Sequence, residues 1–163
     1  MNQDKGMGAA GADERETFLR VWQRVSAPAQ GGGAAQGAAY PPVWEEAEFL
    51  DSALSDNALR MGLCRGSLRG LQGALLAQRR RLMAAAYLLT GERRREEPGQ
   101  GQRDLTQGQR CREMYRLCLR SQSAFAAAAG QDTPRRGLYR ALAEENRALA
   151  ERVQGIVEQM MQG

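Results

Sequence analysis

The stretch LLAQRRRLMAAAYLLTGE, from Leu75 to Glu92, decides the predicted fold of this chain. Its apolar residues recur every three or four positions, which is the spacing of one face of an α-helix. Gln78 falls on that apolar row, although an amide is an uncommon residue at a position that faces a core. Arg81 follows three residues later, close to the same face of the helix. The fold has to account for both residues.

The same spacing recurs along the chain and predicts four helices. They cover residues 44–64, 67–89, 104–129 and a last segment from 132 or 133 to about 160. No β-branched run and no Asn-Gly turn in the sequence indicates a strand. The first two helices meet at Arg65–Gly66 and the last two at Gly130–Gln131, so each pair forms an antiparallel hairpin. We therefore predict an all-α fold, an antiparallel four-helix bundle.

The connection between the second and third predicted helices, Glu92 to Arg103, is longer and polar. About a dozen extended residues span roughly 40 Å, whereas a helix of some two dozen residues is ~35 Å long. The connection can therefore cross the whole bundle and return the third helix parallel to the second. We expect this crossover; an up-down-up-down bundle with a looser loop also fits the lengths.

Three segments precede the predicted bundle of residues 44–163. Residues 1–13 are small and polar, and we expect them to be disordered. Residues 14–27 are predicted to form a short amphipathic helix, and residues 28–43, rich in Gly, Ala and Pro, a linker. The helix either docks on its own bundle or captures the groove of a partner protein. Its apolar stripe follows i, i+3, i+4 and i+7 spacing and consists of Phe18, Val21, Trp22 and Val25.

Composition narrows the classes of function. The chain has 163 residues, so one domain with a single core is expected. Its formal net charge of +4 permits an acidic partner without requiring one. No apolar run approaches the ~20 residues that span a bilayer, and the first residues carry no hydrophobic signal segment. We expect a cytoplasmic protein that does not associate with membranes.

Histidine is absent, which excludes Ser-His-Asp and Cys-His catalytic arrangements and the usual zinc sites. The three cysteines, Cys64, Cys111 and Cys118, include no C-x-x-C pair, so no disulfide framework is predicted. We predict that they are small buried residues of the core; paired redox thiols are the alternative.

A residue that is poorly suited to a core interrupts the apolar row near the middle of each predicted helix. Gln78 does so in the second helix and Glu145 in the fourth. The predicted inward row of the fourth helix consists of Leu138, Leu142, Glu145, Leu149, Val153, Ile156 and Met160. The third helix carries Ser121 or Gln122 there, and the first carries the small Ala53, with Asp56 and Asn57 close by. A buried charge is costly unless it is paired. Interruptions near the middle of all four helices therefore indicate that the helices share one structural pattern. The simpler alternative is a slight rotation that leaves Gln78 and Glu145 partly exposed.

Two segments carry a family resemblance. LRGLQGALLAQRRRLMAAAYLLTGE (Leu68–Glu92) resembles the second helix of small bacterial ferritin-like proteins. FAAAAGQDTPRRGLYRALAEENRALAERVQGIVEQMM (Phe125–Met161) resembles their third-to-fourth helix turn and fourth helix. From about Glu45 to Met161 the chain is thus similar to the ferritin-like superfamily, specifically its rubrerythrin-like branch. Members bind two iron or manganese ions through carboxylates of the first and third helices and a Glu-x-x-His of the second and fourth.

The resemblance implies that most of this metal site has been lost. Gln78 takes the place of the second-helix glutamate, and Arg81 that of its histidine. Glu145 keeps the fourth-helix glutamate, while Ala148 takes the place of the histidine. One glutamate and one amide cannot offset the charge of two metal cations. We expect Arg81 or a neighbouring arginine to pair with Glu145, and we expect this ion pair to stabilise the bundle in place of the metal.

The remaining two former metal-site positions carry no carboxylate. The first-helix ligand falls at or next to Ala53, and the third-helix ligand falls on Ser121, one position either way. The resemblance therefore implies a metal-free, non-catalytic ferritin-like bundle without a cofactor, used for interaction or structure. Its expected partners are a protein that the sequence does not name and a second copy of the chain, since ferritin-like bundles commonly pair through helices one and two.

Two other functions remain open. The first is a ferritin-like, metal-binding oxidoreductase that holds a di-iron or di-manganese centre with atypical ligands. Its candidate ligands are Asp56, Glu113, Glu144, Glu145 and Cys64. The second is nucleic-acid binding through the arginines of 79–81 and 93–95. We expect those arginines to form a solvated face, because no aromatic residues are interleaved with them.

Overall fold

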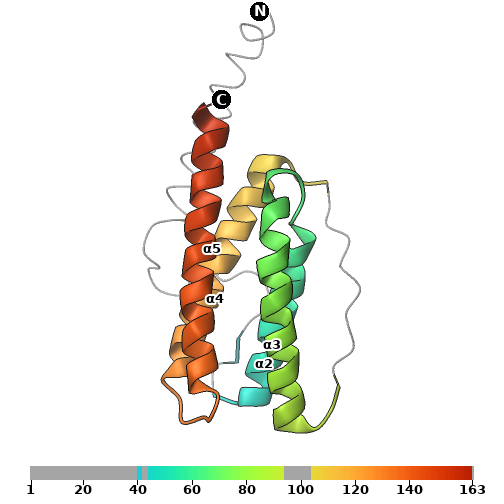
Figure 1. The fold of residues 1–163 in the computed structure, drawn as a ribbon, viewed down its shortest axis with the longest axis vertical. Helices are drawn as coiled ribbons and strands as arrows, with labels where there is room; N and C mark the ends of the chain where they lie inside the picture. Colours follow the sequence, from blue (N-terminus) through green and yellow to red (C-terminus); the bar gives the residue numbers. More distant parts are fainter. Residues whose placement is uncertain (1–39, 42–43, 94–103, 163) are drawn as a thin grey trace, which may run out of the picture.

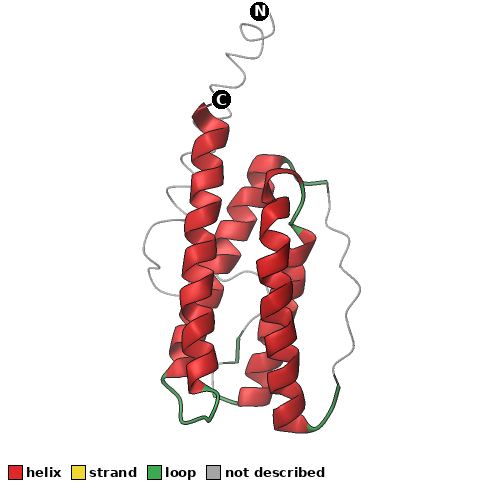
Figure 2. Ribbon diagram, in the orientation of Figure 1, coloured by secondary structure: helices red, strands yellow, loops and turns green. Residues whose placement is uncertain are grey.

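The computed structural model describes residues 40–41, 44–93 and 104–162, and within these residues the chain is helical and contains no strand (Figures 1 and 2). The all-α prediction is confirmed for this part of the chain. The predicted helix of residues 14–27 and the segment 1–13 lie outside the described residues. The elements are α2 (Glu46–Gly62), the 3₁₀-helix η1 (Gly66–Leu71), α3 (Gln72–Thr90), α4 (Gln107–Ala129) and α5 (Arg136–Gln162).

The described helices pack as two hairpins. α2 lies beside α3, and α4 lies beside α5; within each pair the helices run in opposite directions (Figure 1). The element η1 joins the first pair and replaces the first turn of the helix predicted from residue 67. In the view of Figure 1, α3 ends at the bottom of the molecule and α4 begins at the top.

Local sequence signals set the helix ends. Glu45 caps α2, because its carboxylate accepts hydrogen bonds from the backbone N–H groups of Ala47 and Glu48. Thr106 and Gln109 form a reciprocal capping box at the start of α4, with N···O distances of 2.9 and 3.1 Å. Gly91 ends α3 with a φ of 75°, a left-handed conformation that glycine adopts without strain at a helix C-terminus.

The core of the described bundle consists of two apolar clusters. The first apolar cluster packs η1 and the start of α3 against the start of α4 and the second half of α5, and includes Leu68, Leu75, Cys118 and Val153. The second apolar cluster lies toward the other end and includes Phe49, Leu82, Phe125 and Leu142. Its centre is Phe49, whose ring centroid lies 5.3–5.5 Å from those of Tyr40, Trp44, Phe125 and Tyr139.

Tyr40 belongs to the segment that we predicted as a linker, yet its ring packs on the second apolar cluster.

An ion pair joins α2 to the turn between α4 and α5 at the same end of the bundle. Glu46 at the start of α2 pairs with Arg135, which precedes α5. The carboxylate also accepts hydrogen bonds from the hydroxyls of Thr133 (2.8 Å) and Tyr139. The turn between α4 and α5 is therefore tied to the first residues of α2.

Candidate functional site

Buried polar residues from all the α-helices of the described bundle separate the two apolar clusters. On α3, Gln78 lies between Leu75 of the first cluster and Leu82 of the second. On α5, Asn146 lies between Leu142 and Leu149 in the same way. We call this set the polar layer. Its members, each fully buried, are Asp56, Asn57, Arg60, Gln78, Ser121 and Asn146.

Asp56 supplies the negative charge of the polar layer. Its carboxylate forms an ion pair with Arg120 of α4, whose side chain is 14 % exposed. Tyr40 donates its hydroxyl to Asp56 Oδ2 at 2.9 Å, and Ser121 donates to the same oxygen at 3.4 Å. Burial, together with the charge of Asp56, raises the pKa of Tyr40, so this phenol remains a neutral hydrogen-bond donor.

Arg60 places a second guanidinium in the polar layer. Its Nη1 donates to Asn146 Oδ1 and lies 3.9 Å from the sulfur of Cys118. Asn146 in turn donates its Nδ2 to the carbonyl oxygen of Leu142 at 2.8 Å, which fixes the orientation of the amide. Nε and Nη2 of Arg60 have no hydrogen-bond partner, and Arg60 forms no ion pair with a described residue.

α3 and α2 are joined by side chains that bond to backbone. Asn57 donates to the carbonyl oxygen of Leu75 at 2.9 Å. Arg79, also buried, donates to the carbonyl oxygen of Leu54 at 3.3 Å and lies 3.5 Å from Asn57 Oδ1. By contrast, both polar atoms of the Gln78 amide are buried without a partner among the described residues.

The structure brings part of the predicted site together. Gln78 and Ser121 lie in the polar layer, and Ala53 is buried beside it in the second apolar cluster. The rotated-helix alternative is thus wrong for Gln78. The expectation that Glu145 faces the core is wrong, because its side chain is 41 % exposed and Asn146 occupies the inward position. Ala148 is exposed as well.

The inward turn of Asn146 has a physical reason. The row of α5 that contains Asn146 also buries Tyr139 and Val157, whereas the predicted row would bury Leu138 and Met160. An amide costs less to bury than an ionised carboxylate, so the rotation that leaves Glu145 at the surface is favoured. The predicted pairing of Arg81 with Glu145 is confirmed, but the two side chains meet at the surface of the bundle.

Four contributors to the site were not predicted as such: Arg60, Arg120, Tyr40 and Asn146. An arginine at an inward helical position is uncommon, and nothing in the sequence indicated that Arg60 would reach Asn146, 86 residues away. One usable signal was present, since Asp56 and Arg60 are spaced i, i+4 and must share a helix face.

The arginine triplet 79–81 is divided by the fold. Arg79 is buried, Arg81 pairs with Glu145, and Arg80 is exposed. These three arginines therefore do not form a single cationic patch. The triplet 93–95 lies outside the described residues except for Arg93.

The residues present do not fit a di-iron or di-manganese centre. Within the described part of the chain, no three His, Cys, Asp or Glu side chains lie close enough together to hold a metal ion. Asp56 is engaged by Arg120, and Glu113 and Glu144 each pair with an arginine one turn away on their own helix. Cys64 donates to a backbone carbonyl oxygen at 3.4 Å, and burial raises its pKa to about 11.

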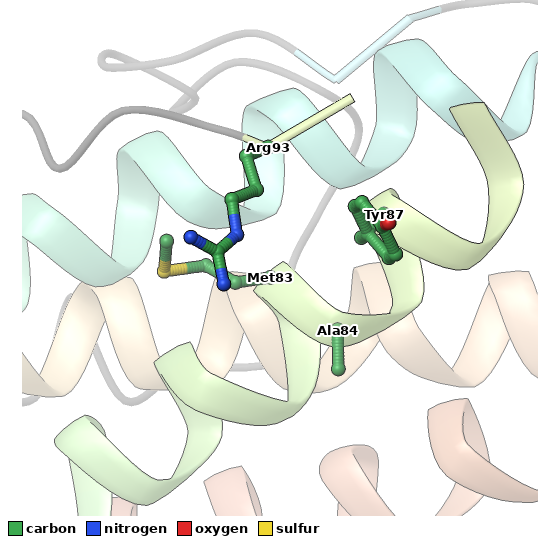
Figure 3. Close-up of a pocket in the computed structure, with 4 residues that line it drawn as sticks. All are labelled: Met83, Ala84, Tyr87 and Arg93. Carbon is green, nitrogen blue, oxygen red and sulfur yellow. The ribbon is translucent and has the colours of Figure 1, made fainter. Parts of the chain in front are cut away.

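A second feature of interest is the surface of α3 that faces away from the bundle. Met83, Ala84 and Tyr87 line a surface hollow together with Arg93, and Figure 3 shows the Arg93 side chain extending beside Met83. Tyr87 is 50 % exposed, and the adjacent Leu88 is 76 % exposed. We call Met83, Ala84, Tyr87 and Leu88 the α3 patch.

Comparison with protein-family models, with curated proteins and with solved structures finds no significant match to this chain. None of the described helices combines the length and apolar character needed to cross a bilayer.

Proposed function

We propose that this chain is a non-catalytic, ferritin-like bundle with a crossover between α3 and α4, and that it acts as a protein-interaction module. Two observations support the bundle type. The end of α3 and the start of α4 lie at opposite ends of the molecule in Figure 1. The polar layer lies midway along the bundle, where the helices of a ferritin-like protein carry their metal ligands.

The observation that carries the interaction role is the α3 patch. Tyr87, Leu88 and Met160 are the exposed large hydrophobic residues of the described chain, and two of these are adjacent on α3. Single exposed apolar side chains are ordinary, whereas contiguous exposed ones mark binding surfaces. Tyr87 also lines the hollow, and Leu88 lies next to it in the sequence. The patch extends over more than one turn of a regular helix, so it suits an amphipathic helix laid across it.

The charges around the α3 patch indicate the chemistry of the partner. α3 contains no acidic residue between Gln72 and Thr90, while Arg80 is exposed one turn before the patch and Arg93 lines the hollow. A second copy of the chain would bring like charges together at this surface. An acidic amphipathic helix from another protein complements both the apolar centre and the cationic rim, and it is the occupant that we propose.

Site-specific photo-crosslinking tests this assignment. A benzophenone side chain replaces Leu88 in the full chain, expressed in the cells that make the protein, and the linked peptide is sequenced. Ala141, exposed on α5, carries the same group in a control. The expected result is a link from position 88, absent from position 141, to an acidic amphipathic helix of another protein.

A synthetic peptide with the sequence of the linked helix is then expected to bind the full chain. Leu88→Glu is expected to abolish this binding, and Arg80→Glu to weaken it and to reduce its salt dependence. A link to residues 14–27 of the same chain, a cross-linked dimer, or a peptide whose binding is unaffected by Leu88→Glu contradicts the proposed partner.

A further inference from the structure

The polar layer contains hydrogen-bond donors that no described residue satisfies. Arg60 is fully buried, and its Nε and Nη2 atoms lie without a partner on one edge of the guanidinium. This edge presents two parallel N–H groups, the fork that binds two oxygens of a carboxylate or oxyanion. Gln78, likewise fully buried, has an unpartnered amide in the same layer.

The charge of the polar layer is also unbalanced. Asp56 is its acidic residue, and that carboxylate is engaged by Arg120, Tyr40 and Ser121. Neutralisation does not relieve the cost of burying a guanidinium, because arginine side chains stay charged in proteins. An uncompensated buried cation is strongly unfavourable. Arg60 therefore forms no direct ion pair with a described residue, and two of its donor atoms lack acceptors among those residues.

α2 and α3 contact each other in this layer. Asn57, about one turn before Arg60 on α2, donates to the carbonyl oxygen of Leu75, about one turn before Gln78 on α3. Arg60 also bonds to Asn146 on α5. The two unpartnered groups thus enter the layer from α2 and α3, with Asn146 on the α5 side.

We propose that the polar layer binds one small planar anion with paired acceptor oxygens, of the carboxylate or nitrate type. The free edge of Arg60 binds the two oxygens, and the amide nitrogen of Gln78 supplies a further donor. One negative charge matches the unbalanced charge of Arg60, and complete burial of the layer restricts the ligand to a few atoms. This inference is independent of the α3 patch and of its partner.

Thermal unfolding of the full chain provides the first test. At constant ionic strength, sodium formate or sodium nitrate replaces sodium chloride over three decades of concentration. The expected result is a melting temperature that rises with the logarithm of the formate or nitrate concentration, because the anion binds the folded state. Sodium sulfate stabilises folded proteins in general because it is excluded from their surface, so the substitutions below, and not sulfate, separate binding at the site from a general salt effect.

Matched substitutions separate binding at Arg60 from general salt effects. Arg60→Met removes the fork with little change in volume and is expected to lose the anion-dependent rise. Arg80→Met makes the same change at an exposed position of α3. This variant is expected to keep the anion-dependent rise in melting temperature. Gln78→Met is expected to shift the rise to higher anion concentration.

Line broadening of ¹³C-formate by the unsubstituted chain gives a readout that does not depend on how the variants fold. Broadening that nitrate reverses supports the site. A melting temperature that is the same in formate, nitrate and chloride, together with an unbroadened formate signal, would show that internal water satisfies these donors and would overturn the proposal.

Discussion

Arg81 of α3 and Glu145 of α5 form an ion pair that links the two hairpins at the surface of the bundle, with side chains 38 % and 41 % exposed. Asp56 of α2 and Arg120 of α4 form a second link between the hairpins, but the Asp56 carboxylate is completely buried. The two pairs share their chemistry and differ in depth. Depth decides what each contributes to stability, because water screens the outer pair and cannot reach the inner carboxylate.

Asp56→Ala is expected to lower the free energy of unfolding by about 3–5 kcal/mol. The substitution leaves the largely buried guanidinium of Arg120 without its carboxylate and removes the acceptor of Tyr40 and Ser121. Urea denaturation followed by circular dichroism measures the change. A loss below 1 kcal/mol would mean that the layer rearranges to solvate Arg120.

Glu145→Ala is expected to change the free energy of unfolding by only ~0–1 kcal/mol, the usual range for an exposed pair. Arg81, the partner that remains after the substitution, is accessible to water, so no buried charge is left unpaired. The same denaturation assay, run beside Asp56→Ala, gives the comparison. A loss as large as that of Asp56→Ala would contradict the outward position of Glu145.

Glu46 is expected to make stability depend on pH in the acid range. Burial raises the pKa of its carboxyl, but hydrogen bonds from Arg135, Tyr139 and Thr133 outweigh burial and hold the pKa below its ordinary value. The stabilisation is therefore complete above the unfolded pKa of about 4.3 and is lost as pH falls through the lower folded value. The wild type should exceed Glu46→Gln in unfolding free energy near pH 6, and this difference should shrink toward pH 3. A difference that is constant with pH would be inconsistent with a lowered pKa.

The cysteines are expected to be unreactive in the folded protein. Cys64, Cys111 and Cys118 are all buried free thiols, and burial raises the pKa of each. With a pKa of about 11, only about one Cys64 thiol in a thousand is ionised at pH 8. Iodoacetamide should alkylate them rapidly in urea and very slowly without it, as mass spectrometry over time would show. Rapid labelling of the native chain would revive the redox interpretation.

Metal content is expected to be well below one ion per chain after untagged purification from medium supplemented with iron and manganese. The acidic side chains nearest the expected site are engaged by arginines, and Gln78 and Asn146 are neutral. Elemental analysis and a thermal melt with added metal check this. Two ions per chain with a raised melting temperature would favour the oxidoreductase alternative.

Periodicity was sufficient to predict the helices and the burial of Gln78, because leucines flank Gln78 on the same face in both directions. It was insufficient for α5. The predicted and observed rows share Leu142, Leu149 and Val153, so spacing alone does not choose between Glu145 and its neighbour Asn146. That choice depends on the desolvation cost of a carboxylate, which becomes decisive only when the other helices close around the position.

The contacts of Arg60 and Tyr40 could not be predicted for a different reason. Arg60 reaches Asn146 and Tyr40 reaches Asp56 across sequence separations of 86 and 16 residues. Neither pair follows a helical or turn spacing, so only the packed structure brings them together. Local sequence patterns therefore carry no information about these two contacts.

The division of the core by the polar layer has a consequence for how the bundle unfolds. The aromatic end, centred on Phe49, and the aliphatic end, around Leu68 and Val153, are held by separate sets of apolar contacts. Breaking one set does not directly break the other, so we expect the two ends to open as separate cooperative units with their own free energies. Amide hydrogen exchange should then show two protection levels along a single helix such as α5, with the step falling near Asn146.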